Sequence, residues 1–221
     1  HTQTPLYIIN PFLIQEIENA KYIEDYGILT GSQNITGDNE KYLKCFWEVS
    51  NKSVGEKWRF YAKGGDYRQY YGNLSFLVDW SESARNFYAT NKTSNLVSEE
   101  FWYKPGITYS AITSRGTGFR YLPEGCIFDK GGPSINLDCD TSEILALLNS
   151  NVAKYYFWVF NPSINLQVKD VKSFPVKVSN NDEVVKKAEI NIEFCKKDWD
   201  SYETSWEFME HPLVRLKKEI N

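Results

Sequence analysis

The spacing of hydrophobic positions changes several times along the chain and predicts short strands interspersed with helices. Short apolar or alternating runs predict strands over residues 27–35, 45–49, 58–63 and 76–80. Five further β-like pieces are separated by turns rich in glycine and proline, which indicates a twisted β region with many loops. These pieces are 101–103, 107–113, 119–122, 126–128 and 134–137.

Apolar residues at helical spacing predict two helices in the first half of the chain. Residues 11–24 carry such a pattern, and Pro11 suits the first turn of a helix. Ser81 can accept a hydrogen bond from the start of a second, shorter helix, whose apolar positions include Phe87 and Tyr88.

A longer helix is predicted to begin after Asp140, which with Glu143 forms a capping-box-like pattern. It is expected to stop at Asn161-Pro162, because proline disfavours helical backbone in the residue before it. The apolar stripe of this helix consists of Ile144, Leu147, Leu148, Val152, Tyr155, Tyr156 and Val159. Beyond it, the alternation over 164–168 predicts a half-buried strand, and 174–176 predicts an edge segment.

The last long helix carries a heptad stripe, which predicts packing on a neighbouring helix or on the domain. The stripe consists of Val185, Ala188, Ile192, Cys195, Trp199, Tyr202 and Trp206. Together the patterns predict an α+β fold, with an irregular mixed β-sheet core, packed helices and a long C-terminal helix. We expect a main domain over 1–178 and a helical appendage over 179–221.

The composition is that of a protein with a sizeable core. Of the 221 residues, 42% are hydrophobic and 16% are aromatic, so some rings are expected on a recognition surface. No apolar run is long enough for a membrane span, and no signal peptide is visible. The four cysteines lack metal-ligand spacing, which favours reduced thiols and a cytoplasmic location. The chain does not begin with Met, and we expect a fragment of a longer protein.

The net charge of −4 argues against a simple polyanion binder, but the charge is unevenly distributed. Residues 41–130 carry thirteen basic and nine acidic residues, whereas 1–40 and 181–221 are acidic overall. A basic middle between acidic ends is compatible with one local electropositive face.

Within this basic middle, residues 57–73 combine aromatic rings, a glycine pair and flanking positive charge. Gly64 and Gly65 allow close approach of a partner to the backbone, and Lys63 and Arg68 flank them. This combination suits a partner that bears phosphates or bases. The pattern alone favours a plainer interpretation, namely a strand, a Gly-Gly turn and a helix start with solvated charges.

Signals for catalysis are sparse. Asp170 and Lys172, with Asp138 or Asp140 upstream, have the spacing of a Mg²⁺-dependent nuclease, although the favoured interpretation is a helix cap with a solvated lysine. Residues 116–119 are too short and badly placed for the cofactor loop of a methyltransferase. Asn161-Pro162 begins like the loop that holds a target amine, but the second proline and the aromatic residue are missing.

An ordered set of motifs resembles the C-terminal region of PglX-type adenine-specific DNA methyltransferases. These enzymes belong to BREX phage-defence systems and to related fused restriction–modification systems. The resemblance covers most of the chain, from about residue 27 to 213, and each motif is modest alone. The motifs are 36–39, 47–49, 62–68, 71–73, 78–80, 104–110, 119–123, 147–150, 161–162, 166–170, 198–206 and 211–213.

The resemblance implies that this chain is the target-recognition part of such an enzyme, without its catalytic domain. It implies double-stranded DNA, the parent's own N-terminal methyltransferase domain and possible other defence-system subunits as partners, with no membrane. S-adenosylmethionine and N6-adenine methylation are implied for the parent, whereas no cofactor, metal or catalytic residue is expected in this fragment.

A recognition domain must grip phosphates and read base edges, which sets the candidate DNA contacts. Each polar candidate could equally support the fold. Two alternatives stay open, namely the nuclease with Asp170 and Lys172, and a protein-interaction module that uses the heptad helix. The candidates are Lys63, Gly64, Gly65, Arg68, Asn73, Arg115, Arg120, Asn165 and Gln167.

Overall fold

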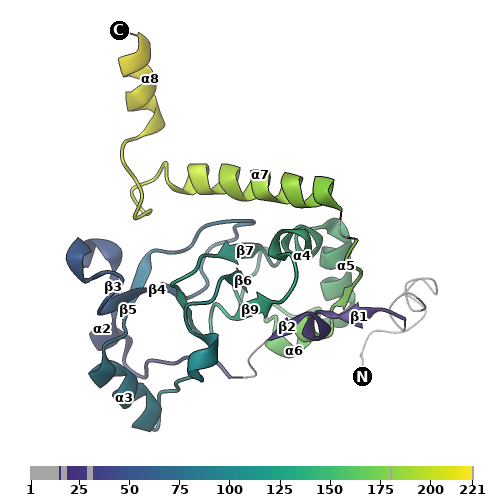
Figure 1. The fold of residues 1–221 in the computed structure, drawn as a ribbon, viewed down its shortest axis with the longest axis horizontal. Helices are drawn as coiled ribbons and strands as arrows, with labels where there is room; N and C mark the ends of the chain where they lie inside the picture. Colours follow the sequence, from purple (N-terminus) through teal and green to yellow (C-terminus); the bar gives the residue numbers. More distant parts are fainter. Residues whose placement is uncertain (1–14, 16–18, 29–31, 180, 221) are drawn as a thin grey trace.

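The computed structural model describes residues 15, 19–28, 32–179 and 181–220, which form a mixed α and β fold (Figure 1). One sheet has the order β2-β9-β6-β7, and every neighbouring pair in it is antiparallel. The strands are β2 (Gly27–Ile28), β9 (Ser134–Leu137), β6 (Gly106–Tyr109) and β7 (Phe119–Leu122).

A second sheet has the order β3-β5-β4-β8 and is mixed, because β8 joins β4 in parallel while the other pairs are antiparallel. Its strands are β3 (Leu43–Cys45), β5 (Phe76–Asp79), β4 (Trp58–Ala62) and β8 (Ile127–Phe128). A small antiparallel pair, β1 (Lys21–Tyr22) with β10 (Pro175–Val176), completes the β-structure of the described residues. The predicted α+β class with an irregular mixed β core is confirmed.

Helices surround these sheets, and the longest of them joins the two halves of the core. α7 packs on α4, and its Ile192 contacts the core beneath the first sheet. Ile192, Cys195 and Trp199 contact a second core that includes Ala62 of β4. Figure 1 shows α7 running along the side of the molecule that carries α4 and β7, with α8 projecting away from the rest. The helices are α2 (Asn39–Tyr42), α3 (Glu82–Thr90), α4 (Thr141–Leu148), α5 (Asn151–Phe160), α6 (Val168–Lys172), α7 (Asp182–Trp199) and α8 (Pro212–Ile220).

Several elements agree with the sequence predictions. β7 and β9 have the predicted bounds, and β4 and β5 differ from them by one residue at the C-terminal end. Ser81 caps α3 by accepting from Ala84 N, and Asp140 caps α4 by accepting from Ser142 N and Glu143 N. The heptad stripe packs within the chain as far as Trp199, where α7 ends. The predicted division at residue 178 stays a prediction.

Other predictions were wrong in ways that local hydrogen bonds explain. The single helix predicted from 140 to 160 is broken into α4 and α5, because Ser150 accepts from Ala153 N and caps a new helix. The predicted strand at 164–168 is a loop followed by α6, and Ile164 is 64% exposed. The strand predicted at 45–49 contains the 3-10 turn η3 (Phe46–Glu48), and the one predicted at 101–103 starts on the last residue of the 3-10 turn η5 (Glu99–Phe101).

At the N-terminal end, part of the predicted structure falls outside the described residues. Most of the predicted helix at 11–24 lies there, and its described end forms β1 and the 3-10 turn η2 (Ile23–Asp25). A further 3-10 turn is η4 (Asn51–Ser53). None of the helices in the described part of the chain has the length and apolar character that crossing a membrane requires. The cytoplasmic location stays a prediction.

Candidate nucleic-acid interface

The glycine pair after β4 is held tightly by the neighbouring loops. Gly64 is buried with φ +83°, and a Cβ built on it would lie 2.5 Å from the carbonyl oxygen of Gly131. Ser110 Oγ donates to the carbonyl oxygen of Gly65 at 3.0 Å. Lys63 Nζ lies 3.2 Å from Asp129 Oδ2. The positive charge of Lys63 is therefore partly neutralised, and this side chain braces the loop.

Arg68 has a similar structural partner at the end of α7. Its guanidinium donates to Asp198 Oδ2 at 3.1 Å and lies 4.8 Å from the centre of the Trp199 ring. Asn73 Nδ2 donates to the carbonyl oxygen of Asp66 at 2.8 Å and closes the loop on itself. Two of the resembling motifs, at 62–68 and 198–206, therefore meet in space. Residues 63–73 are called the Gly-Gly loop below.

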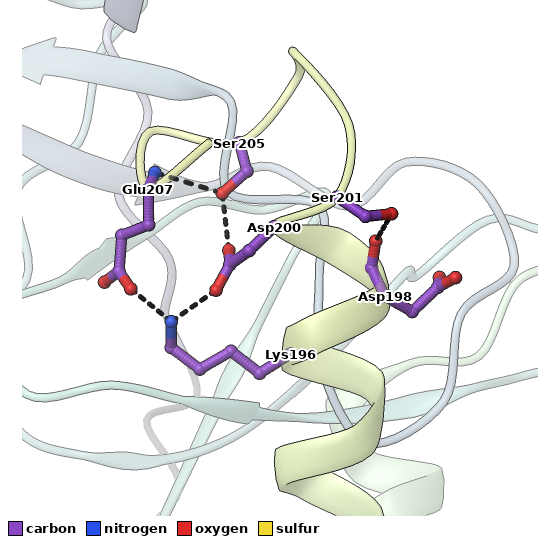
Figure 2. Close-up of polar contacts among 6 residues, drawn as sticks. All are labelled: Lys196, Asp198, Asp200, Ser201, Ser205 and Glu207. Atoms are coloured by element: carbon purple, nitrogen blue, oxygen red, sulfur yellow. Dashed lines mark hydrogen bonds and ion pairs between the residues drawn. The ribbon is translucent and has the colours of Figure 1, made fainter. Parts of the chain in front are cut away.

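The segment after α7 is folded by a polar network around Lys196 (Figure 2). Lys196 Nζ lies 2.6 Å from Asp200 Oδ2 and also pairs with Glu207. Ser205 Oγ donates to Asp200 Oδ1 at 2.6 Å and accepts from Glu207 N. Hydrogen bonds to the two carboxylates, together with the nearby Tyr71, raise the pKa of Lys196 against the opposing effect of burial. The network thus fixes the turn that follows Trp199.

Replacing Lys196 with alanine is expected to lower the free energy of unfolding by about 1–2 kcal/mol, because two carboxylates lose their shared cation. The matched control is Lys187→Ala, which removes an exposed ion pair with Glu183 from the same helix and is expected to cost about 0.5 kcal/mol or less. Urea unfolding of both variants checks the difference. Equal destabilisation would show that the network does not hold the turn.

The Gly-Gly loop and the turn after α7 form the walls of a groove, called the loop groove, with a volume of about 740 Å³. Its lining is mixed in charge, since the carboxylates of Asp66 and Glu203 accompany the guanidinium of Arg68. A polyanion is not favoured by such a lining. The predicted contacts Gly64, Gly65, Arg68 and Asn73 all line this groove.

A second groove, of about 510 Å³, has a different charge. Three lysines line it without any carboxylate from the described residues, and we call it the lysine groove. The amide residues Asn165 and Gln167, both predicted as DNA contacts, belong to the same lining and are exposed. The lysines are Lys130, in the loop between β8 and β9, and Lys169 and Lys172 of α6.

A short chain of backbone contacts connects the two grooves. Gly64 abuts Gly131, whose carbonyl oxygen accepts from Ala111 N at 3.0 Å. The carbonyl oxygen of Ala111 in turn accepts from Leu166 N at 2.8 Å. The Gly-Gly loop is therefore packed against the loop that carries Lys130, and that loop is linked through Ala111 to the segment that carries Asn165. The Gly-Gly loop therefore supports the residues that line the lysine groove and does not line the groove itself.

The two remaining arginines lie in contrasting places. Arg115 is exposed, in the loop that pairs with Ile164 through Thr113 N. Arg120 is only 1% exposed and donates to the carbonyl oxygen of Gly118 at 3.2 Å. Burial, with a smaller effect of Arg68, lowers the pKa of Arg120 to about 10. Its position inside the sheet gives it a structural role in this conformation, and we leave it out of the proposed contact surface.

The residues considered for a nuclease are occupied locally. Asp170 Oδ2 accepts from Gln167 N at 2.9 Å and from Asn161 Nδ2 at 2.6 Å, so it caps α6. Asp140 caps α4. Within the described residues, no group of three or more histidine, cysteine, aspartate or glutamate side chains could hold a metal ion. Lys172 belongs to the lysine groove.

Sequence reasoning missed Lys130 and Lys169, because each stands alone in the sequence as a solvated charge. Lys130 lies 39 positions before Lys169, and the fold brings them to one groove. A hint was present in the motif at 166–170, where Gln167 and Lys169 occur together. The loop and α6, which replace the predicted strand, place Gln167 and Lys169 beside Lys130.

Comparison with known proteins points the same way as the motifs. The chain is similar to curated adenine-specific methyltransferases. BrxX of Escherichia coli O9:H4 (strain HS) is 31% identical over 198 residues, which cover 85% of this chain and 16% of that protein. PglX of Lacticaseibacillus casei (strain Zhang) is 28% identical over 207 residues, covering 85% of this chain and 17% of that protein. No protein-family model matches the chain.

This likeness confirms the resemblance in part. It supports an association with BREX-type adenine-specific methyltransferases across most of the chain. The chain spans about a sixth of the length of these curated relatives. Target recognition, the cofactor and the partners stay predictions.

Proposed function

We propose that this chain recognises double-stranded DNA for an adenine-specific methyltransferase of a phage-defence system. The observation that carries the proposal is the lysine groove, in which three lysines and the amide side chains of Asn165 and Gln167 converge without a carboxylate from the described residues. Ammonium groups neutralise phosphates, whereas amide side chains can pair with the edge of adenine. The likeness to BrxX and PglX supplies the adenine-specific context.

The lysine and amide side chains of the groove are assigned different roles because their chemistry differs. Phosphate contacts fix the register of a protein on DNA, and base-edge contacts read the sequence. Lys130, Lys169 and Lys172 are assigned to phosphates, and Asn165 and Gln167 to base edges. Arg115, exposed on the loop next to Ile164, extends the positive surface. Methylation itself, with S-adenosylmethionine, is assigned to the parent enzyme outside this chain.

The two alternatives receive less support. A nuclease would need the Asp170 carboxylate for a metal, but its Oδ2 already accepts two hydrogen bonds that shape α6. An interaction module on the heptad helix would need an open stripe, but Ala188 and Trp199 are buried in this chain. Double-stranded DNA is therefore the partner that we propose.

Removing the three lysines together should weaken duplex binding by about 10- to 500-fold at about 0.1 M salt. The salt dependence should weaken as well, because each lost phosphate contact lowers the slope of log K against log salt by about 0.9. Fluorescence anisotropy of the variant Lys130→Ala/Lys169→Ala/Lys172→Ala with a labelled duplex measures both quantities.

The control variant is Lys52→Ala/Lys92→Ala/Lys104→Ala, which removes three exposed lysines from outside the groove. It therefore changes the net charge by the same amount as the triple variant in the groove. It should retain the affinity and slope of the wild type to within a few fold. Equal losses in both variants would reject the lysine groove as the binding site. A wild-type chain that ignores the duplex at low salt would reject the proposed function.

A further inference from the structure

An outward-facing pair of aromatic rings lies on α5, beside the lysine groove. Trp158 is 61% exposed and Tyr155 is 40% exposed, and their ring centres are 6.0 Å apart. The opposite face of the same helix is packed in the core through Ala153, Phe157 and Val159. A surface helix is usually polar on its outer face. Exposed aromatic rings at this position therefore indicate a binding surface.

A small hollow of about 170 Å³ lies against Trp158. Lys154 lines it together with Trp158, and no carboxylate of the described residues does so. Its volume is below the roughly 300 Å³ at which pockets for drug-sized ligands begin, so it suits one flat ring system. The polar boundary is supplied by Asn161, Ser163 and the backbone beside Gly116.

The hollow and the lysine groove are neighbours. Leu166 lines both of them, and Asn161 Nδ2 donates to the carbonyl oxygen of Asn165 at 2.9 Å across the boundary. Arg115, exposed, precedes Gly116 at the rim of the hollow. The aromatic pair is therefore flanked by cationic side chains on more than one side.

We propose that Trp158, with Tyr155 and Lys154, forms a stacking platform for an unpaired nucleobase next to the duplex in the lysine groove. Positive charge beside flat aromatic rings is the chemistry that binds single-stranded nucleic acid, because every base has a face that can stack. An apolar protein partner would not require the surrounding lysines and arginine. The proposal rests on the proposed function and adds a second class of ligand to it.

A pair of duplexes tests the platform, one fully paired and one identical except for a single unpaired base. The wild type is expected to prefer the duplex with the unpaired base, and Trp158→Ala to lose that preference. The expected loss is about 5- to 150-fold, the fold-change that corresponds to stacking of one base on an aromatic ring. Affinity for the fully paired duplex should stay unchanged, and Trp158→Phe should keep most of the preference.

Trp47→Ala is the matched control, because Trp47 is also 61% exposed but lies in η3, beside the second sheet. It should behave as the wild type with both duplexes. An unchanged preference in Trp158→Ala would overturn the platform while leaving duplex binding intact. Loss of self-association in Trp158→Ala, without any change in DNA binding, would also overturn it and assign the face to a second copy of the chain. Duplex binding that does not depend on the three groove lysines would reject the lysine groove as the binding site, and a wild-type chain that ignores both duplexes would reject the proposed function.

Discussion

Replacing Trp199 with alanine is expected to lower the free energy of unfolding by about 3–5 kcal/mol, the range for truncating a large aromatic residue in a core. Trp199 is 6% exposed and belongs to the core that contains Ala62, Leu74 and Phe128. The Arg68 guanidinium covers its ring at 4.8 Å. Truncation therefore removes apolar contacts and also the surface on which the Gly-Gly loop rests.

The measurement is thermal unfolding followed by circular dichroism. A loss of 3–5 kcal/mol corresponds to a fall in Tm of roughly 6–20 °C for a chain of this size. Trp47→Ala is again the control, since the same side chain is removed from an exposed site, and a change within about 1 kcal/mol is expected. Equal melting temperatures for the two variants would mean that the end of α7 contributes nothing to the core.

The same experiment tests the predicted division of the chain at residue 178. α7 contributes Ile192 and Trp199 to cores built from the sheets. We therefore expect the wild type to unfold in a single transition. A separate low-temperature transition, removed by Trp199→Ala, would favour an independent helical appendage over 179–221.

Local sequence signals predicted the elements that depend on local chemistry. Ser81 and Asp140 begin helices because their side chains accept from the first free backbone amides. β7 and β9 alternate with glycine- and proline-rich turns, which set their ends. The fold class could therefore be predicted from the sequence, since it needs only the kinds and order of these elements.

Predictions failed where a local cap or a distant partner overrides the sequence pattern. Alternation at 164–168 indicated a strand, but the Asp170 carboxylate caps a helix that begins at Val168, and the pairing of this segment with 111–113 is an isolated antiparallel bridge between Ile112 and Asn165. Lys63 was predicted to contact DNA from its neighbours in sequence, whereas Asp129, 66 positions away, pairs with it. The lysine groove depends on such long-range contacts, and its complete lining could not be read from the sequence.

Replacing Gly64 with alanine is expected to lower the free energy of unfolding by about 2–5 kcal/mol through two separate effects. The first is backbone strain, because φ is +83° and an L-residue pays about 1–2 kcal/mol there. The second is steric, because the new Cβ would lie 2.5 Å from the carbonyl oxygen of Gly131, and overpacking costs about 1–3 kcal/mol.

A matched glycine separates the two effects in equilibrium urea unfolding. Gly55 has a nearly identical φ of +89°, but no atom lies within 4 Å of its would-be Cβ. Gly55→Ala should therefore show the strain alone, about 1–2 kcal/mol. The difference between the variants measures how closely the Gly-Gly loop packs on the loop of Lys130. Equal losses would contradict that packing. If this loop positions the lysine groove, Gly64→Ala should lose more free energy of unfolding than Gly55→Ala. It should also bind the duplex more weakly under conditions in which it is folded.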